Sequence, residues 1–452
     1  MATATKTTEV AVSNGLGNEE EDESSRSSIR AMLAKLTLNK NPKKQVIPLG
    51  LGDPATYPCF RVGQNVAEAV VKSLTSGKYN TYAPSFGIAD ARRAVAEYLS
   101  EGVPKGLGLV EEDVYMTVGG SQAIEICLAA LGRGKRGPYN ILMPKPGFLL
   151  YQNFCALNNI EPRFYHLLPQ SNWEVDLDGV RHIADDNTLA IVVINPNNPC
   201  GAVYSRYHLQ QIAEVAGKLK VPVVSDEIYG HIVFGGSEFV PMVSFASITP
   251  IITIGGLSKR FLVPGWRLGW IALSKPQGSL KQTRIKEDIE KLMNVIPGPS
   301  SFIQVELLPS FIVMLVCCFY KAEALNHQSK AALPSILSDS NQHFHENMIS
   351  LLGSCADACY SGIERIKALY CPSKPRGSMF IMVKVQISLL SNVNDDVEFA
   401  TELMKEESVL VLPGSILGLK DWVRIHFGAP PEILEEALDR IESFCERHKN
   451  CR

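Results

Sequence analysis

The chain carries the stretch GGLSKRFLVPGWRLGW at Gly255–Trp270, directly after the apolar, β-type residues 250–254. This stretch holds Lys259 and Arg267 eight residues apart on a glycine-rich loop. A lysine at the end of a buried strand can form a Schiff base with an aldehyde when burial and cationic neighbours lower its pKa. An arginine held by a Pro-Gly-Trp turn suits two-pronged capture of a phosphate. Pyridoxal 5′-phosphate (PLP) has both groups, so the stretch predicts a PLP site, whereas a Ser-Lys pair alone would indicate only a surface lysine.

The length and composition are those of a globular enzyme. With 452 residues the chain has room for two or three domains, and its 46% hydrophobic and 20% charged residues are ordinary. The net charge of −3 offers no basic surface for nucleic acid or an anionic membrane, so neither is expected as a partner. The eleven cysteines have neither metal-ligand nor disulfide-framework spacing, which predicts no metal site and a reducing compartment.

Residues 1–28 are rich in Ser, Thr and Glu, which predicts a disordered acidic tail. The tail lacks the apolar core of a secretory signal and is too acidic for an organelle transit peptide, so we expect a cytosolic protein. The one long apolar run, Leu307–Tyr320, contains a proline. It is shorter than the roughly 20 residues that span a bilayer, so no membrane segment is expected.

Apolar, strand-like runs alternate with helical patterns between about 110 and 275. A helix capped by Ser205 separates two of these runs. Such alternation indicates an α/β fold with a mainly parallel sheet covered by helices. The pattern beyond about 360 indicates a smaller α+β domain. The expected strands are 114–118, 140–143, 189–194, 221–225 and 251–254 in the large domain and 379–383, 409–412 and 422–425 in the small one, with helices at 396–407 and 431–447.

Polar motifs follow the strands of the large domain, where an open α/β sheet places its ligand crevice. Gly119 and Gly120 precede a helix whose free N–H groups could hold a phosphate, although this pair also suits an ordinary turn. The Asn/Pro-rich segment 195–201 has a composition that tight turns share. Asp226 ends an apolar strand, where a carboxylate is costly unless a cation, such as a protonated pyridine nitrogen, pairs with it. Tyr229, three residues on, could reach the phenolic oxygen of the same ring.

Together the motifs resemble those of the PLP-dependent aminotransferases of fold type I, class I/II, and within these the plant tyrosine aminotransferases. The similarity runs from about residue 45 to the C-terminus. We therefore expect an N-terminal segment (29–75) that packs on the small domain, a large PLP-binding domain (76–304) and a small C-terminal domain (331–452). The similar stretches are LGLGDP at 49–54, YAPSFG at 82–87, PKPGF at 144–148, the turn of Asn198, SDEIY at 225–229, the Lys259 stretch and WVRI at 422–425.

The resemblance implies a role for each matching residue. Lys259 would be the Schiff-base lysine and proton carrier, and Asp226 and Tyr229 would complete the catalytic set. Arg424 would bind the substrate α-carboxylate through a bidentate fork, with Gly52 and Asn198 beside it; alone, Arg424 would indicate a surface arginine. The implied cofactor-binding residues are Gly120, Ser121, Gln122, Phe148, Asn198, Asp226, Tyr229, Lys259, Arg267 and, from the partner subunit of a homodimer, Tyr82.

Three features depart from the family pattern. Cys200 stands where many relatives have threonine, and Gly256 stands where some have a phosphate-binding serine. The largest departure is residues 305–330, which interrupt what should be one helix near the active site and the subunit interface. Three explanations of this segment are open: a retained intron or gene-model error, a membrane-touching or partner-binding loop, and a tolerated surface insertion.

The activity implied by the resemblance is transamination of an aromatic L-amino acid, tyrosine first, with 2-oxoglutarate as acceptor. Two alternatives stand beside it. Plant relatives that share these motifs include C–S lyases, which differ in the fate of the carbanion. The segment 305–330 could also leave the protein inactive.

Overall fold

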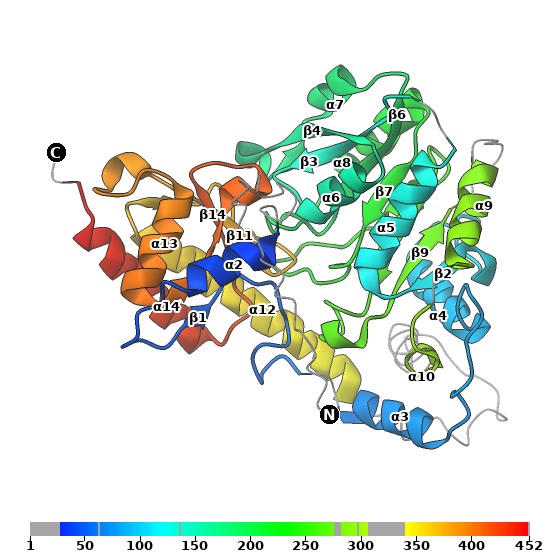
Figure 1. Ribbon diagram of the computed structural model, residues 1–452, viewed down its shortest axis with the longest axis horizontal. Helices are drawn as coiled ribbons and strands as arrows, with labels where there is room; N and C mark the ends of the chain where they lie inside the picture. Colours follow the sequence, from blue (N-terminus) through cyan, green and yellow to red (C-terminus); the bar gives the residue numbers. More distant parts are fainter. Residues whose placement is uncertain are drawn as a thin grey trace, which may run out of the picture.

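The computed structural model describes residues 28–61, 64–134, 137–274, 282–295, 298–305 and 340–450. Figure 1 shows two sheets of different size, each with its own helices, and a long helix, α12 (Ser340–Arg365), beside the smaller one. The expected tail 1–28 and the atypical segment 305–330 lie outside the described residues, except for Ser28 and Val305.

The large sheet has eight strands in the order β2-β9-β8-β7-β6-β3-β4-β5. The central neighbours β8, β7, β6, β3 and β4 are parallel, whereas β2, β9 and β5 pair in antiparallel fashion. The fold class predicted from the sequence, α/β with a mainly parallel sheet, is therefore confirmed. The strands are β2 (Val114–Thr117), β3 (Asn140–Lys145), β4 (Glu161–Leu168), β5 (Glu174–Val175), β6 (Thr188–Ile194), β7 (Val223–Asp226), β8 (Ile251–Gly256) and β9 (Gly269–Leu273).

Helices cover both faces of the large sheet. Successive residues of a strand point to opposite faces, and in the central strands the residues on both faces are apolar. On β6, Val192 and Ile194 pack in the same buried cluster as α5, α6 and α9, whereas Ile191 and Val193 pack with α8. The cap predicted for α8 is confirmed, since Ser205 Oγ accepts a hydrogen bond from the N–H of His208 at 3.1 Å. The helices of this part are α4 (Ala89–Leu99), α5 (Gly119–Gly132), α6 (Leu149–Leu157), α7 (Leu177–Ile183), α8 (Arg206–Leu219) and α9 (Gln282–Met293), while α3 (Gln64–Thr75) packs on α10 (Ser301–Val305), which contacts α4.

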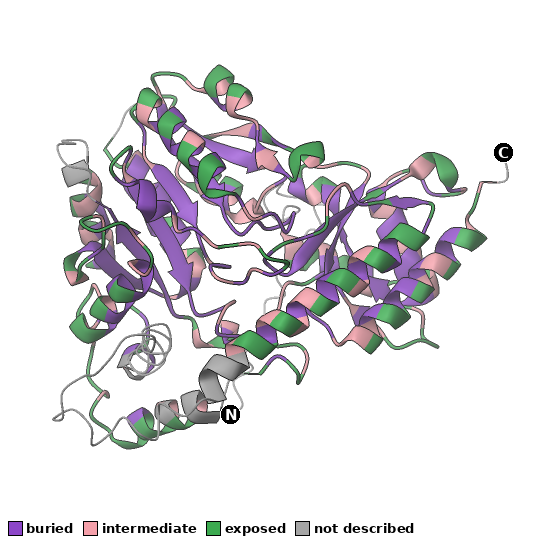
Figure 2. Cartoon of the chain, turned by 180° about the vertical axis from the view of Figure 1, so that it is seen from behind, coloured by how far each residue is buried: buried purple, intermediate pink, exposed green. Residues whose placement is uncertain are grey.

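The smaller sheet is antiparallel, with the order β10-β11-β14-β13. Helices α12 and α14 pack against each other beside it, and α13 packs against α14. Figure 2 shows the strands of both sheets as buried and the outward sides of the helices as exposed. The elements are β10 (Leu369–Tyr370), β11 (Phe380–Val385), β13 (Leu412–Pro413), β14 (Trp422–His426), α13 (Asp396–Glu407) and α14 (Pro431–Arg447).

The N-terminal segment runs along the smaller sheet. After α2 (Ile29–Thr37), strand β1 (Ile47–Pro48) pairs in parallel with β12 (Val409–Leu410). Lys44 forms a salt bridge with Glu407 at 2.5 Å, and the carbonyl of Leu49 accepts a hydrogen bond from the N–H of His426 at 2.8 Å. These contacts bring the following residues, Gly50–Asp53, to the region between the two sheets.

Candidate active site

Three neighbouring parallel strands, β6, β7 and β8, end side by side at the carboxyl-terminal side of the large sheet, where the sequence predicted the ligand crevice. Asn195 follows β6, Asp226 is the last residue of β7, and Lys259 follows β8 by three residues. The N–H of Asn195 donates to the carbonyl of Asp226 at 3.0 Å, and the N–H of Glu227 donates to the carbonyl of Ile254 at 2.8 Å. The polar segments that were separate in the sequence therefore meet in one place.

Asp226 carries a buried carboxyl group that no described cation neutralises. Its Oδ2 accepts a hydrogen bond from the hydroxyl of Tyr151 at 3.0 Å, and its Oδ1 accepts one from the N–H of Ile228 at 3.2 Å. Burial raises the pKa of Asp226 to about 6, although both hydrogen bonds act in the opposite direction. A cation placed beside Asp226 would be strongly favoured.

Lys259 projects its amine into the space between the two sheets. The Nζ atom donates to the carbonyl of Gly52 and lies 5.7 Å from the centre of the Tyr229 ring. The pKa of Lys259 is lowered to about 8, chiefly by burial; Asp53 acts in the opposite direction, and the charges of Arg424 and Arg267 contribute to the lowering. The neutral amine, which is the nucleophilic and basic form, is therefore accessible near neutral pH.

Arg424 lies in the middle of β14 and is 2% exposed. Its Nη1 donates to Asn198 Oδ1 at 3.0 Å and its Nη2 to the carbonyl of Gly50 at 2.9 Å. Nε has no hydrogen-bond partner among the described residues. Burial lowers the pKa of Arg424 to about 10, so the group stays charged at neutral pH. A buried guanidinium with an unsatisfied N–H is suited to a carboxylate ligand.

Arg267 lies beside the beginning of α5, on another side of the site. Arg267 Nη1 donates to the carbonyl of Pro264 at 2.9 Å, and Nη2 lies 3.4 Å from the carbonyl of Val118, which precedes α5. Helix α5 starts at Gly119, so the predicted residues Gly120 and Ser121 lie in its first turn, whose free N–H groups favour an anion. Gln122 Oε1 is engaged locally, since it accepts from the N–H of Val118 at 2.6 Å.

The remaining predicted residues are placed less directly. Tyr229 lies beside Lys259 and is only 2% exposed. Burial raises the pKa of its hydroxyl. Phe148 is half-buried directly before α6, and no contact between it and Lys259 is found among the described residues. Tyr82 is fully exposed on this chain and takes part in none of the hydrogen bonds or ring contacts found in the described ranges.

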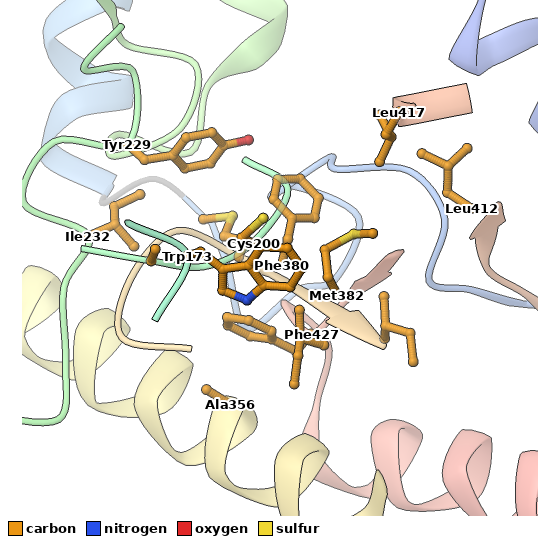
Figure 3. Close-up of a cluster of buried hydrophobic side chains, with 14 of the residues drawn as sticks. Trp173, Cys200, Tyr229, Ile232, Ala356, Phe380, Met382, Leu412, Leu417 and Phe427 are labelled. Atoms are coloured by element: carbon orange, nitrogen blue, oxygen red, sulfur yellow. The ribbon is translucent and has the colours of Figure 1, made fainter. Parts of the chain in front are cut away.

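The sequence interpretation missed two residues that the structure brings into the site. Tyr151 holds Asp226, and its position on α6, three residues after Phe148, was the available signal. Phe380 lies under the guanidinium of Arg424, with the guanidinium carbon 4.2 Å from the ring centre. Figure 3 shows Phe380 in the same buried cluster as Tyr229. Both residues had been treated only as parts of apolar runs or not at all.

The buried charges test whether PLP fits this site. Asp226 and Arg424 are buried and Lys259 is half-buried, and none of them forms a salt bridge with another residue of the described ranges. PLP and an amino acid would supply the missing groups: a pyridine nitrogen for Asp226, an aldehyde for Lys259, a phosphate for Arg267 and a carboxylate for Arg424. The residues present therefore fit the cofactor predicted from the sequence.

Two other classes of site were searched in the described part of the chain. No group of three or more His, Cys, Asp or Glu side chains there is arranged to hold a metal ion. Within the same ranges, no helix combines the length and apolar character needed to cross a bilayer.

Comparison with known proteins agrees with this geometry. A family profile described as aminotransferase class I and II matches residues 44–441. Nicotianamine aminotransferase 1 of Oryza sativa subsp. japonica is 45% identical over 424 residues, which cover 93% of this chain and 80% of that protein. S-alkyl-thiohydroximate lyase of Arabidopsis thaliana is 40% identical over 434 residues, 96% of this chain and 87% of that protein. The crystal structure of tyrosine aminotransferase from Leishmania infantum superposes with a TM-score of 0.81 at 30% identity, covering 98% of this chain and all of that one.

Proposed function

Because this chain belongs to the aminotransferase class I and II family, whose cofactor is PLP, we propose that it moves the amino group of an aromatic L-amino acid to a 2-oxo acid. Tyrosine is the proposed donor and 2-oxoglutarate the proposed acceptor. The observation that carries this proposal is a set of three ionisable groups, the buried Asp226 and Arg424 and the half-buried Lys259, none of which forms a salt bridge with another described residue.

The bound cofactor supplies an aldehyde for the amino group and an electron-withdrawing ring that stabilises negative charge at the substrate α-carbon. Lys259 accepts the proton from that carbon at Nζ and returns it. A pKa of about 8 suits this task near neutral pH, because the neutral amine is present and its conjugate acid is still a proton donor. The carbonyl of Gly52 accepts a hydrogen bond from the free amine at Nζ.

Asp226 would pair with the protonated pyridine nitrogen, and the hydrogen bond from Tyr151 fixes the carboxylate for that role. Tyr229 and Asn198 would hydrogen-bond the phenolic oxygen of the ring. Phe148 would cover one ring face, and the first turn of α5 with Gly120, Ser121 and Gln122 would hold the phosphate with Arg267. Arg424 grips the substrate α-carboxylate with its free Nε–H and is kept in place by Asn198 and Gly50.

We propose further that the active enzyme is a cytosolic homodimer in which Tyr82 reaches the phosphate of the neighbouring subunit. Tyr82 is fully exposed on this chain, and Val71 and Leu74, one helical turn apart on α3, are 58% and 54% exposed. Exposed apolar side chains grouped on one face are typical of an interaction surface. The eight cysteines in the described ranges are all unpaired, which suits a reducing compartment.

Two relatives favour a second candidate for the substrate or the outcome. The relative from rice is named for nicotianamine, and the one from Arabidopsis thaliana is named as a lyase of S-alkyl thiohydroximates. Their similarity extends over nearly the whole chain, so each chemistry is a candidate here. The C–S lyase is the alternative in which the charge at the α-carbon leads to loss of a thiolate instead of return of the proton.

The test is to purify the protein with PLP and to record its absorption spectrum with and without tyrosine. We expect tyrosine to convert the cofactor to its amine form and 2-oxoglutarate to reverse the change. Parallel assays would measure 2-oxo acid formed from tyrosine, phenylalanine and nicotianamine, and thiol released from an S-alkyl thiohydroximate. A protein that binds PLP but leaves its spectrum unchanged with tyrosine and releases thiol would contradict the proposed donor and support the lyase.

A further inference from the structure

Phe380, the first residue of β11, contacts parts of the site that come from three separate segments. The guanidinium carbon of Arg424 lies 4.2 Å from its ring centre. The Tyr229 ring meets it edge-on at 5.9 Å between centres. A Cβ atom at Gly52 would come within 2.4 Å of its Cζ atom, so the N-terminal segment passes close against the outer end of the ring. Phe380 itself is 1% exposed.

This arrangement fixes the plane of the Arg424 guanidinium. Two edges of the group are held by hydrogen bonds to Asn198 and Gly50, and its face rests on the Phe380 ring. The remaining edge, with Nε, is the one without a partner among the described residues. An arginine binds a carboxylate in two-pronged fashion only when the carboxylate lies in the plane of the guanidinium. The ring therefore determines the direction in which Arg424 can accept a carboxylate.

We propose that Phe380 is a positioning residue for the substrate carboxylate: its ring holds Arg424 in the plane that binds the carboxylate and requires glycine at position 52. The inference rests on the proposed function in one respect, namely that Arg424 binds the carboxylate of the amino and oxo acids. It predicts a loss of affinity for both substrates when the ring is removed, with little change in the turnover number at saturation.

The first experiment compares Phe380→Leu with Phe399→Leu in the PLP-loaded enzyme. Phe399 is equally buried, on α13, where its ring pairs with Phe444 at 5.5 Å, so the same substitution there costs packing without touching Arg424. The ligands are 3-phenylpropanoate and glutarate, which carry the carboxylates of the proposed substrates and lack the reacting groups, and binding is measured by calorimetry. We expect Phe380→Leu to weaken both ligands on the order of tenfold, as loss of a desolvated cation–π contact does. Phe399→Leu should leave them within about twofold, within the usual scatter for a distant site.

The second experiment needs neither cofactor nor substrate. In the apoprotein, the stability lost through Phe380→Leu should be smaller when Arg424→Met is already present, because the ring then has no cation to hold. In the same way, the damage done by Gly52→Ala to ligand binding should shrink in the Phe380→Leu background, since leucine lacks the atom that the new methyl group meets.

These outcomes separate the inference from the proposed function. Additive stability changes, or ligand affinities that respond equally to Phe380→Leu and Phe399→Leu, overturn the inference. An enzyme that does not transaminate tyrosine but binds the carboxylates with the Phe380 dependence described overturns the proposed substrate alone and supports the inference. Wild-type enzyme that binds neither carboxylate overturns both.

Discussion

Asp226 is a residue at which burial costs the apoprotein electrostatic stability. Burial raises the pKa of its carboxyl from 3.8 to about 6, so the folded apoprotein holds a proton that the unfolded chain releases between these values. The stability linked to this group is full below the unfolded pKa and is lost as the pH rises through about 6. At pH 7.5 an ionised Asp226 therefore lowers the stability of the apoprotein.

The first prediction follows from that sign. Asp226→Asn should stabilise the apoprotein at pH 7.5 by about 1–3 kcal/mol relative to wild type, and the gain should disappear near pH 4. The same variant should lose most of its catalytic rate, because no carboxylate faces the ring nitrogen. Denaturant titrations at several pH values measure the first effect, and the exposed Asp357→Asn serves as the control. Equal stability of wild type and Asp226→Asn at pH 7.5 would be evidence that the carboxyl is not desolvated.

The second prediction concerns the charge geometry of Arg424. Arg424→Lys keeps a cation but loses the fork that contacts Asn198 and Gly50 and the flat face that rests on Phe380. The KM values for the amino acid and the oxo acid should rise, because each charge-assisted hydrogen bond that is lost costs about 1.5–3 kcal/mol of binding free energy. Steady-state kinetics measure the change, with the exposed Arg365→Lys as a matched control. Unchanged KM values would place the carboxylate elsewhere.

The structure brings together several of the residues that the sequence analysis singled out. Lys259, Asp226, Asn198 and Arg424 do converge, because each follows or occupies a strand whose neighbours are fixed by the fold. What the sequence could not supply was the contacts between them. The bond from Arg424 to Asn198 joins residues 226 positions apart, and no local pattern encodes such a distance.

At the scale of elements, β9 can lie close to the start of α5 only because residue 269 is a glycine. A side chain on Gly269 would come within 2.6 Å of the backbone carbon of Gly119 and 2.8 Å of the nitrogen of Gly120. Backbone at this distance cannot move aside without shifting the helix. The first turn of α5 and Arg267 would then separate, and both belong to the proposed phosphate site.

The third prediction is therefore that Gly269→Ala weakens PLP binding at least tenfold, because overpacking of this kind typically costs about 1–3 kcal/mol. Gly265→Ala, four residues earlier in the turn that precedes β9, is the control, since nothing lies within 4 Å of a Cβ atom at that position. Fluorescence titration of the two apoproteins with PLP gives both affinities. If Gly269→Ala binds PLP as tightly as Gly265→Ala, the phosphate site is not formed by Arg267 and the first turn of α5.

Helices with a strong apolar pattern were predicted almost to the residue, whereas some strands were missed or were given different bounds. Helices 396–407 and 431–447 agree with α13 and α14 because their apolar residues recur at helical spacing on one buried face. Strand β4 (Glu161–Leu168) was missed because its residues EPRFYHLL include charges, a proline and a histidine. The expected strand 409–412 is divided between β12 and β13, which pair with different partners, β1 and β14. Pairing partners are a property of the tertiary fold and cannot be read from a four-residue run.

At the scale of the whole molecule, the proposed homodimer has a direct test. If Tyr82 serves the neighbouring site, a dimer of one Tyr82→Ala chain and one Lys259→Ala chain should contain one site with both residues intact. We expect each variant alone to be severely impaired, and the mixed dimer to recover up to about half of the activity per dimer of wild type. Co-expression with two affinity tags isolates the mixed species. No recovery in a verified mixed dimer would show that Tyr82 acts within its own chain or not at all.

The last prediction concerns residues 305–330, whose sequence includes the uncharged run FIVMLVCCF at 311–319. The residues just before the segment are firmly attached to the large domain. Gln304 is fully buried, its Oε1 accepts from the N–H of Ile88 at 2.8 Å, and Ser301 Oγ donates to the carbonyl of Tyr79 at 2.5 Å. The segment 305–330 therefore begins close to the stretch that carries Tyr79 and Tyr82, on the side proposed for the partner subunit.

An apolar run of this composition is an aggregation hazard when it is exposed, and at this place it would also compete with dimer formation. Deleting 305–330, which joins Gln304 to Ala331, should allow the helix that starts at Ser301 to continue. We expect the shortened protein to be more soluble, to form dimers at lower concentration and to transaminate faster than the full chain. Light scattering, sedimentation and turnover of tyrosine measure the three effects. A deletion protein that is less soluble and less active would mean that 305–330 is an integral part of the fold, because removing a foreign insertion cannot destabilise the structure it interrupts.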